Sequence, residues 1–208
     1  VLSERFDHGK EAASYQTAIA DLKRTACFPA EGDTQSWHRP DELYAPFRAE
    51  AFRSQALILD YQSRTRLRTE LLERLGIKIN PETRLVIDHL RDCVVKGVQP
   101  HVSTYQVLNE AAQREEPIVG TLAGAPCIYV ESLKTFVRPN QVYWTPPQLG
   151  RFAFTVPGSL EPFKPLFTAI GVKAAPDGPD LVAILLDIVG EHYEQTKPIT
   201  GSDRAVYD

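Results

Sequence analysis

The sequence lacks methionine altogether among its 208 residues, so we expect the chain to be part of a larger protein. It also lacks any run of about 18 or more apolar residues, the length that a membrane-spanning helix requires. The opening residues have no apolar centre of the kind that a signal peptide carries. These absences predict a cytoplasmic protein that has no membrane partner.

Cysteine is scarce, and the three cysteines, Cys27, Cys93 and Cys127, show no C-x-x-C spacing. An odd number of widely spaced cysteines argues against a disulfide framework and favours reduced, buried thiols. Positive charge is not in excess either, because the net charge is -4 and the pI about 5.8. The alternating Arg64, Arg66 and Arg68 are followed by glutamates, which favours a solvated helix face over a nucleic-acid contact.

Motifs of catalysis and cofactor binding are also absent. No G-x-x-x-x-G-K-[ST] or G-x-G-x-x-G phosphate loop occurs. His89 and Cys93 have the spacing of two zinc ligands on a helix, but no third or fourth ligand stands at a familiar distance, so we interpret them as core residues. Cys27 and Cys127 begin apolar runs beside aromatic residues, where a thiol is usually buried and inert. We therefore predict no catalytic residue, metal or cofactor in this chain.

The chain contains one phrase twice. SWHRPDELY at residues 36–44 is answered by FVRPNQVYW at residues 136–144, and further matches surround both. Internal repetition of this kind indicates a repeat architecture. The matched positions are Cys27, Arg39, Pro40, Tyr44, Gly76 and Pro81 in the first copy, and Cys127, Arg138, Pro139, Tyr143, Gly171 and Pro176 in the second.

Each matched position predicts local structure. A short apolar run, a polar turn and a second run predict a β-hairpin that ends before Pro40 and Pro139, since proline cannot donate to the ladder. Leucines at 67, 71, 72 and 75 predict a helix with one apolar face. Gly76 and Gly171 are placed to end such a helix in the left-handed conformation.

A second helix comes next in each copy. Asn80 as N-cap and Pro81 at the first helical position predict its start in the first copy, whereas Pro176 and Pro179 are alternatives in the second. The run LVAILLDIVG at residues 181–190 is apolar almost all round, so we expect that helix to be buried between layers. Residues 101–122 predict another helix with a break near Pro117.

These observations predict an α+β fold of tandem repeat modules, each a small hairpin or sheet followed by packed helices. The first module covers residues 1–100 and the second residues 101–190. We expect residues 191–208 to be the start of a further, truncated module or a tail. The reason is that Tyr207 and the residues before it resemble Tyr105 and the residues before it.

The order of these motifs resembles the internal repeats of sacsin and its bacterial relatives, large cytoplasmic proteins with a GHKL-type ATPase domain. The resemblance rests on the cysteine hairpin, the Arg-Pro pair, the Leu-Gly-Ile-Lys helix end and the Pro-x-x-x-Leu-Val helix start. It covers roughly residues 20 to 190. It implies a non-catalytic, chaperone-associated scaffold that binds client or partner proteins and other domains of its own chain, with the ATPase site outside this segment.

Two alternatives remain at this point. The modules are also compatible with the scaffold of a bacterial stress or defence system whose effector domain lies elsewhere in the chain or complex. An enzyme in its own right would require a cleft of converging polar groups. Trp37 and Trp144 are candidate partner-binding residues, although packing within their own modules also accounts for them.

Overall fold

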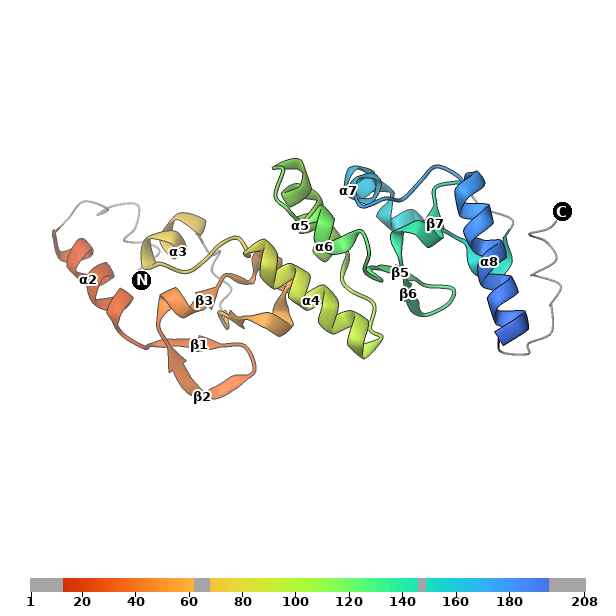
Figure 1. Cartoon of the computed structure of the whole chain (residues 1–208). Coiled ribbons are helices and arrows are strands. Elements are labelled where there is room, and N and C mark those ends of the chain that lie inside the picture. The colour runs from red at the N-terminus through yellow and green to blue at the C-terminus, as the bar shows by residue number, and fades with distance from the viewer. Residues whose placement is uncertain (1–12, 62–67, 146–148, 195–208) are drawn as a thin grey trace. The chain divides into compact units, whose positions relative to one another are not determined.

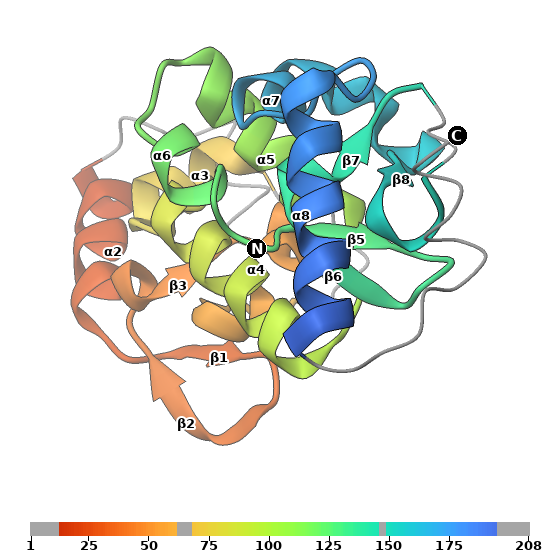
Figure 2. The ribbon, with the colours of Figure 1, turned by 45° about the vertical axis from the view of Figure 1, so that its right-hand side comes forward.

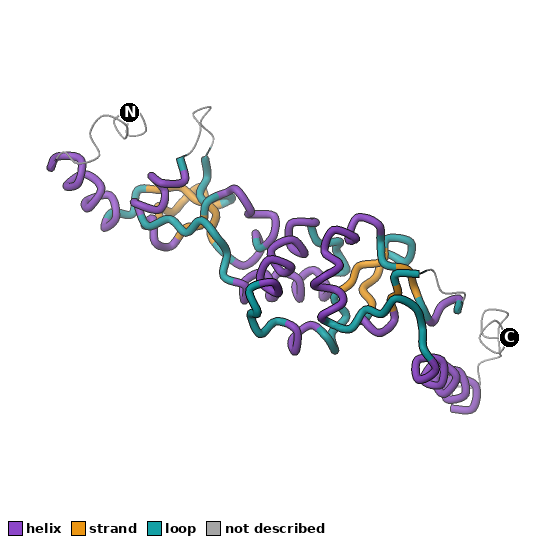
Figure 3. The backbone as a smooth tube through the Cα atoms, turned by 90° about the horizontal axis from the view of Figure 1, so that it is seen from above, coloured by secondary structure: helices purple, strands orange, loops and turns teal. Residues whose placement is uncertain are grey.

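The computed structural model describes residues 13–61, 68–145 and 149–194, and its helices and short strands are seen in Figures 1 and 3. They form two compact units, one up to His89 and one from Leu90, so the division falls inside helix α4 (Thr83–Lys96). Helices and two-stranded sheets occur in both units, which confirms the mixed α+β class. The module boundaries at residues 100 and 190 stay predictions. Leu67, Arg64, Arg66 and Tyr207 lie outside the described residues.

The first unit opens with a helix, continues through short strands and 3-10 turns, and ends with two helices. Its elements are α2 (Ala13–Arg24), β1 (Phe28–Ala30), β2 (Asp33–His38), η1 (Pro40–Glu42), β3 (Leu43–Tyr44), η2 (Pro46–Ala51), η3 (Arg53–Gln55), β4 (Leu57–Ile58), α3 (Thr69–Leu75) and the first part of α4.

Strands β1 and β2 form the antiparallel hairpin that the sequence predicts, and β2 ends before the Arg39-Pro40 pair. Strands β3 and β4 pair in parallel, with Leu43 opposite Leu57. A further parallel bridge joins Tyr44 to Lys78, which lies just beyond α3. The strand β3 thus connects the hairpin to the region between the last two helices.

The core of this unit lies between α2, the sheet strands and α3. Apolar side chains at helical spacing place Tyr15 and Ile19 of α2 inside. Leu71, Leu72 and Leu75 form the buried face of α3, as their spacing predicts. Burial of such side chains stabilises the fold by roughly 1.5–3 kcal/mol for each large aliphatic residue.

Helix α3 ends at Gly76, which has φ 93°, a left-handed conformation that glycine adopts without a side-chain clash. The Ile77 N–H then donates to the Leu72 carbonyl at 2.9 Å and closes the helix end. Helix α4 begins at Thr83, so Asn80 and Pro81 lie in the turn before it. The predicted N-cap role of Asn80 and first-turn role of Pro81 are therefore wrong by two positions, within the usual uncertainty of helix starts.

The second unit contains residues 90–96 of α4 and then a similar mixture of helices, short strands and 3-10 turns. Its elements are α5 (Val102–Gln113), α6 (Val119–Leu122), β5 (Ile128–Val130), β6 (Thr135–Val137), η4 (Pro139–Gln141), β7 (Val142–Tyr143), η5 (Gly150–Phe152), β8 (Phe154–Thr155), η6 (Gly158–Phe163), α7 (Lys164–Ala169) and α8 (Gly178–Glu194).

Strands β5 and β6 form an antiparallel hairpin with Tyr129 opposite Phe136, and β7 pairs in parallel with β8. A bridge joins Tyr143 to Lys173, beyond the end of α7. Gly171 ends that helix with φ 110°. The hairpin and the helix stop are both where the sequence predicts them.

Helices α5 and α7 make the centre of the second unit. Tyr105 of α5 is 3% exposed, and its ring lies 5.5 Å from that of Phe167 in α7. The Tyr105 hydroxyl donates to the Cys127 carbonyl at 2.8 Å, which attaches the start of the β5–β6 hairpin to α5. Helix α5 runs to Gln113, and a separate short helix comes after Pro117, as predicted.

Helix α8 begins with a reciprocal cap. The Asp180 N–H donates to Asp177 Oδ1 and the Asp177 N–H donates to Asp180 Oδ2, both at 3.1 Å. Pro179 therefore lies in the first turn and Pro176 before the cap. Only one side of α8 is buried, with Ile184 and Ile188 inside, so the expected burial all round is wrong for the described residues.

Candidate binding site

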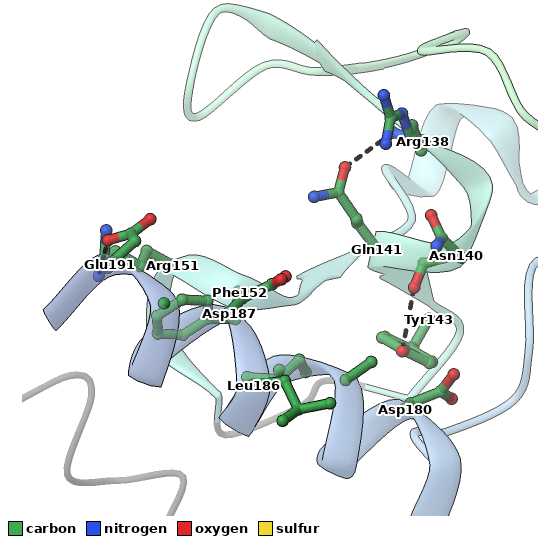
Figure 4. A pocket seen from close by; sticks show the side chains of 13 residues that line it. Arg138, Asn140, Gln141, Tyr143, Arg151, Phe152, Asp180, Leu186, Asp187 and Glu191 are labelled. Atoms are coloured by element: carbon green, nitrogen blue, oxygen red, sulfur yellow. Dashed lines mark hydrogen bonds and ion pairs between the residues drawn. The ribbon is translucent and has the colours of Figure 1, made fainter. Parts of the chain in front are cut away.

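A hollow of about 520 Å³ lies on the second unit, between the segment from Arg138 to Tyr143, η5 and α8 (Figure 4). Its size is that of a pocket for a small molecule or a few side chains of a protein. The lining residues are Arg138, Asn140, Gln141, Tyr143, Arg151, Phe152, Asp180, Ala183, Ile184, Leu186, Asp187, Gly190 and Glu191.

The Arg-Pro turn shapes one wall. The Arg138 N–H donates to Gln141 Oε1 at 3.1 Å, and the Gln141 N–H donates to the Arg138 carbonyl at 3.0 Å. This turn places Tyr143 so that its hydroxyl donates to the Asn140 carbonyl at 3.1 Å, as Figure 4 shows. Burial, assisted by the nearby Asp180 carboxylate, raises the pKa of Tyr143 to about 12. The phenol therefore stays neutral at physiological pH.

Lys173 attaches the start of α8 to this wall. Its Nζ lies 2.9 Å from Asp180 Oδ1 and 2.9 Å from Asp177 Oδ2. The hydrogen bonds that Lys173 donates to these carboxylates raise its pKa, with Asp180 the larger contributor. The same ammonium group lowers the pKa of Asp177. The cap of α8 and the bridge to Tyr143 are thus held by one charged cluster.

The opposite wall is joined to α8 by an ion pair. Arg151 Nη2 lies 2.9 Å from Glu191 Oε2, and its guanidinium lies over the Phe152 ring at 4.6 Å from the centroid. Leu186 adds apolar surface beside these charges and is 65% exposed. Because the two arginines and three carboxylates of the lining nearly balance, the hollow has no strong preference for an ionic ligand of either sign.

The two Arg-Pro turns differ in charge. Arg39 lies 3.6 Å from Asp41 Oδ1 and its Nη2 3.5 Å from Glu42 Oε1. In the second turn the corresponding residues are Asn140 and Gln141, which carry no charge. The backbone geometry of the turn therefore does not depend on the acidic side chains.

The lining residues include no cysteine, serine or histidine, so they offer no thiol–imidazole or hydroxyl–imidazole pair. They do offer hydrogen-bonding groups, apolar surface and charges of both signs to a ligand.

A serine–histidine contact occurs in the first unit, and the sequence analysis missed it. Ser54 Oγ of η3 lies 2.7 Å from His89 Nδ1 of α4, and Gln55 Nε2 donates to the same Oγ at 3.1 Å. His89 is half-buried, and the pair joins η3 to α4. The tertiary fold brings these two residues together, and no sequence motif relates Ser54 to a histidine so distant in sequence.

No protein-family model, curated protein or solved structure matches this chain. The resemblance to sacsin-like repeats therefore stays a prediction.

The two tryptophans lie in different surroundings. Trp37 on β2 is 64% exposed. Trp144 follows β7, is half-buried, and packs edge-on against Phe167 with the ring centroids 6.3 Å apart. Lys164 Nζ lies over the Trp144 ring at 5.2 Å from its centroid. Of the two candidate partner-binding residues, Trp37 offers the larger accessible surface.

The cysteines at the matched positions of the two copies, Cys27 and Cys127, differ in burial. Cys127 is 3% exposed, and burial raises its pKa to about 12. Burial likewise raises the pKa of Cys93, whereas Cys27 is half-buried. A thiol with a raised pKa is a poor nucleophile because little thiolate forms.

The described residues contain neither a cluster of metal ligands nor a membrane-spanning helix. No group of three or more histidine, cysteine or acidic side chains there could hold a metal ion. None of the helices there combines the length and the apolar character needed to cross a bilayer.

Proposed function

We propose that this chain is a pair of repeat modules that serves as a non-catalytic scaffold and protein-interaction segment of a larger, sacsin-like protein of the chaperone type. In this proposal the ATPase domain of that protein lies outside the chain, and the protein is cytoplasmic. The observation that carries the proposal is a frame of backbone hydrogen bonds that recurs in both units.

The hairpins supply the first part of this frame. The Cys27 N–H donates to the His38 carbonyl at 3.2 Å, and the Cys127 N–H donates to the Val137 carbonyl at 3.2 Å. In each case the hairpin ends on the residue before the Arg-Pro pair. The repeated cysteines thus occupy the same place in the ladder of each hairpin.

The second part centres on the repeated tyrosines. Tyr44 bridges in parallel to Lys78 and Tyr143 to Lys173. The residue after each tyrosine donates its N–H to the carbonyl of that lysine, at 2.8 Å in the first unit and 3.1 Å in the second. Each tyrosine carbonyl also accepts a bond from the residue after the fourth strand of its unit, at 2.9 and 3.0 Å.

The helix ends supply the third part. Gly76 and Gly171 both have positive φ, and the next residue donates to a helix carbonyl at 2.9 Å in each unit. Three independent local geometries therefore recur in the same order along the chain. Divergence from a duplicated module explains this order better than separate origins, because each geometry taken singly is common.

Side chains outside this frame have diverged. Trp37 stands where the second copy has Phe136, and the acidic Asp41 stands where it has Asn140. A conserved frame with varied exposed residues is what repeat proteins use to present different binding surfaces. This pattern supports a scaffold more than a single active site.

The test is whether the purified chain binds an unfolding protein. We expect the chain, at a molar ratio near one, to lower the light scattering of a reporter enzyme that is heated until it aggregates. Replacement of the exposed Trp37 by alanine should weaken this effect several-fold, since large aromatic side chains dominate protein contacts. Val95→Ala is the matched control, because Val95 is 85% exposed on α4 and lies outside the hairpin.

Two results would contradict the proposal. One is scattering of the reporter that is unchanged by the chain at every ratio. The other is ATP hydrolysis by the purified chain, which would place the nucleotide site within it.

A further inference from the structure

The hollow on the second unit has one wall of hydrogen-bond donors and one wall that carries carboxylates. Arg138 and Gln141 of the Arg-Pro turn lie on the first wall, and Asp187 of α8 lies on the second (Figure 4). Strands β7 and β8, which follow this turn and η5, lie beside α8 in Figure 2. The two walls therefore come from elements that are distant in the sequence, and both line one space.

Most of the charged groups in the lining are already neutralised. Arg151 Nη2 lies 2.9 Å from Glu191 Oε2, and the Asp180 carboxylate lies 2.9 Å from a lysine ammonium group. Arg138 and Asp187, in contrast, form no ion pair with any residue that the structure describes. The hollow thus has one positive and one negative side chain left for a ligand, on different walls.

Arg138 is unpaired because of the residues that follow it. The Arg39 guanidinium of the first copy lies 3.6 and 3.5 Å from the two carboxylates of its own turn. The second copy has the uncharged Asn140 and Gln141 at those positions. The turn is otherwise alike, since the N–H of each arginine donates to the side chain three residues later, at 2.8 Å in the first copy and 3.1 Å in the second. The second copy thus keeps the arginine and lacks the acids that would occupy it.

Gln141 adds a second donor beside Arg138. Its Oε1 accepts the Arg138 N–H, so its Nε2 group is directed away from that N–H and, in Figure 4, points toward the space in front of α8. This amide nitrogen has no hydrogen-bond partner among the residues that the structure describes. A guanidinium and an amide nitrogen on one wall are donors of the kind that a carboxylate accepts from.

We propose that the hollow binds a short peptide that has a charged terminus at each end. The carboxylate of the peptide accepts hydrogen bonds from Arg138 and Gln141, and its ammonium group donates to Asp187. An apolar side chain of the peptide packs on the half-buried Phe152 and on Leu186, which is 65% exposed.

The shape of the hollow favours a peptide over a single amino acid. Because an α-amino acid carries both charges on one carbon, it is too short to place them on two walls of a hollow of about 520 Å³. Capture of a terminal carboxylate or amine is one of the recurring modes of peptide recognition. The inference goes beyond the proposed scaffold function and does not rest on it.

The test titrates the isotope-labelled chain with the tripeptide Ala-Leu-Ala and follows the amide resonances. We expect saturable shifts at millimolar peptide, concentrated at residues 138–143, 150–152 and 180–191, which line the hollow. Free leucine should bind more weakly, because it engages only one wall. The tripeptide with an acetylated amine or an amidated carboxylate should also bind more weakly, because each modification removes one charge.

Two variants assign the ends of the peptide. Arg138→Gln should weaken binding of the free tripeptide about fivefold, the upper range for an exposed ion pair, and should hardly affect the amidated form. Asp187→Asn should act in the same way on the free tripeptide and hardly affect the acetylated form. Arg39→Gln is the matched control and should leave all affinities unchanged, because Arg39 lies in the first unit.

A third variant restores the acids of the first copy. Asn140→Asp combined with Gln141→Glu should weaken binding as much as Arg138→Gln does, because the arginine then has carboxylates of its own. The turn should persist, since Glu42 Oε2 accepts the Arg39 N–H at 2.8 Å in the first copy. An unchanged thermal midpoint would verify that the variant is folded.

Three outcomes would overturn the inference. One is the absence of saturable shifts in the lining residues at millimolar tripeptide. Another is equal binding of the free, acetylated and amidated peptides, which would mean that the charges of the hollow do not contact the termini. The third is binding of free leucine as tight as that of the tripeptide, which would make the ligand a single amino acid.

Discussion

Asn109 Oδ1, on helix α5, accepts a hydrogen bond of 3.1 Å from the backbone N–H of Leu166 in helix α7. The N–H groups of a first helical turn have no partner within their own helix, so a side chain from elsewhere must satisfy them. Asn109 is 9% and Leu166 1% exposed, which keeps water from replacing the bond. One amide thus caps α7 and fixes it on α5.

Asn109→Ala should lower the free energy of unfolding of the second unit by about 1–3 kcal/mol, the usual cost of leaving a buried N–H without a partner. Urea unfolding followed by circular dichroism would measure it. Gln106→Ala on the same helix is the control, because the Gln106 side chain is exposed and donates at 3.2 Å to Glu110 within α5. Equal effects of the two substitutions would show that Asn109 does not cap α7.

Gly171→Ala should destabilise the chain by about 1–2 kcal/mol, because φ is 110° there and an L-residue is strained at positive φ. Gly190→Ala is the opposite case. Gly190 lies inside α8, and an added Cβ would meet nothing within 4 Å. Since alanine favours the helix, this change should stabilise by about 0.5–1 kcal/mol. Thermal unfolding shows whether each substitution stabilises or destabilises the chain. A stabilising effect of Gly171→Ala would contradict a left-handed helix end at Gly171.

Stability should fall at alkaline pH. The pKa of Tyr143 is raised from about 10 to about 12 by burial, so the unfolded chain loses this proton at lower pH than the folded chain does. The contribution of Tyr143 to the free energy of unfolding is complete below about pH 10 and is lost as the pH rises toward 12. The raised pKa of Lys173 acts in the same direction, above the ordinary lysine value.

The difference in phenolate absorbance between the chain and Tyr143→Phe, recorded from pH 9 to 12, isolates this residue. We expect a midpoint near 12 in the folded chain. Titration of Tyr143 near pH 10 while circular dichroism still shows a folded chain would contradict the burial of its hydroxyl.

The three thiols should differ in reactivity. An aromatic disulfide reagent at pH 8 should label the half-buried Cys27 first and Cys93 more slowly, because burial raises the pKa of the Cys93 thiol. Cys127 should react at least roughly 100-fold more slowly than Cys27, because burial raises its pKa to about 12 and leaves little thiolate. Mass spectrometry of labelled peptides identifies each site. In a Cys27→Ala variant the fast phase should disappear, and its persistence would mean that a buried thiol is accessible in the folded chain.

Local structure was predictable where a few adjacent residues decide it. The β1–β2 and β5–β6 hairpins end before Pro40 and Pro139, and the helices before Gly76 and Gly171 end there, because proline and glycine restrict the backbone directly. The start of α4 at Thr83 was missed, since Asn80 and Pro81 favour a start without compelling one. Helix starts depend on competing caps within a few residues.

Contacts between distant residues were not predictable. Nothing in the sequence indicates that Ser54 meets His89, that Asn109 caps α7, or that η5 and α8 enclose a hollow with Arg151 bonded to Glu191. Each of these contacts depends on how whole elements pack together. The sequence pattern of one element does not indicate where another element lies.

The sequence by itself determined the two hairpins, the helix stops at Gly76 and Gly171 and the repetition of the Arg-Pro-tyrosine pattern, because these depend on local backbone preferences and apolar spacing. The tertiary structure alone decided which apolar residues are covered. The run at residues 181–190 predicts a helix buried all round, yet Val182 and Val189 are exposed while Ile184 and Ile188 are not. Apolar character means that burying a side chain is favourable in free energy. The packing of the elements decides whether a neighbour covers that side chain.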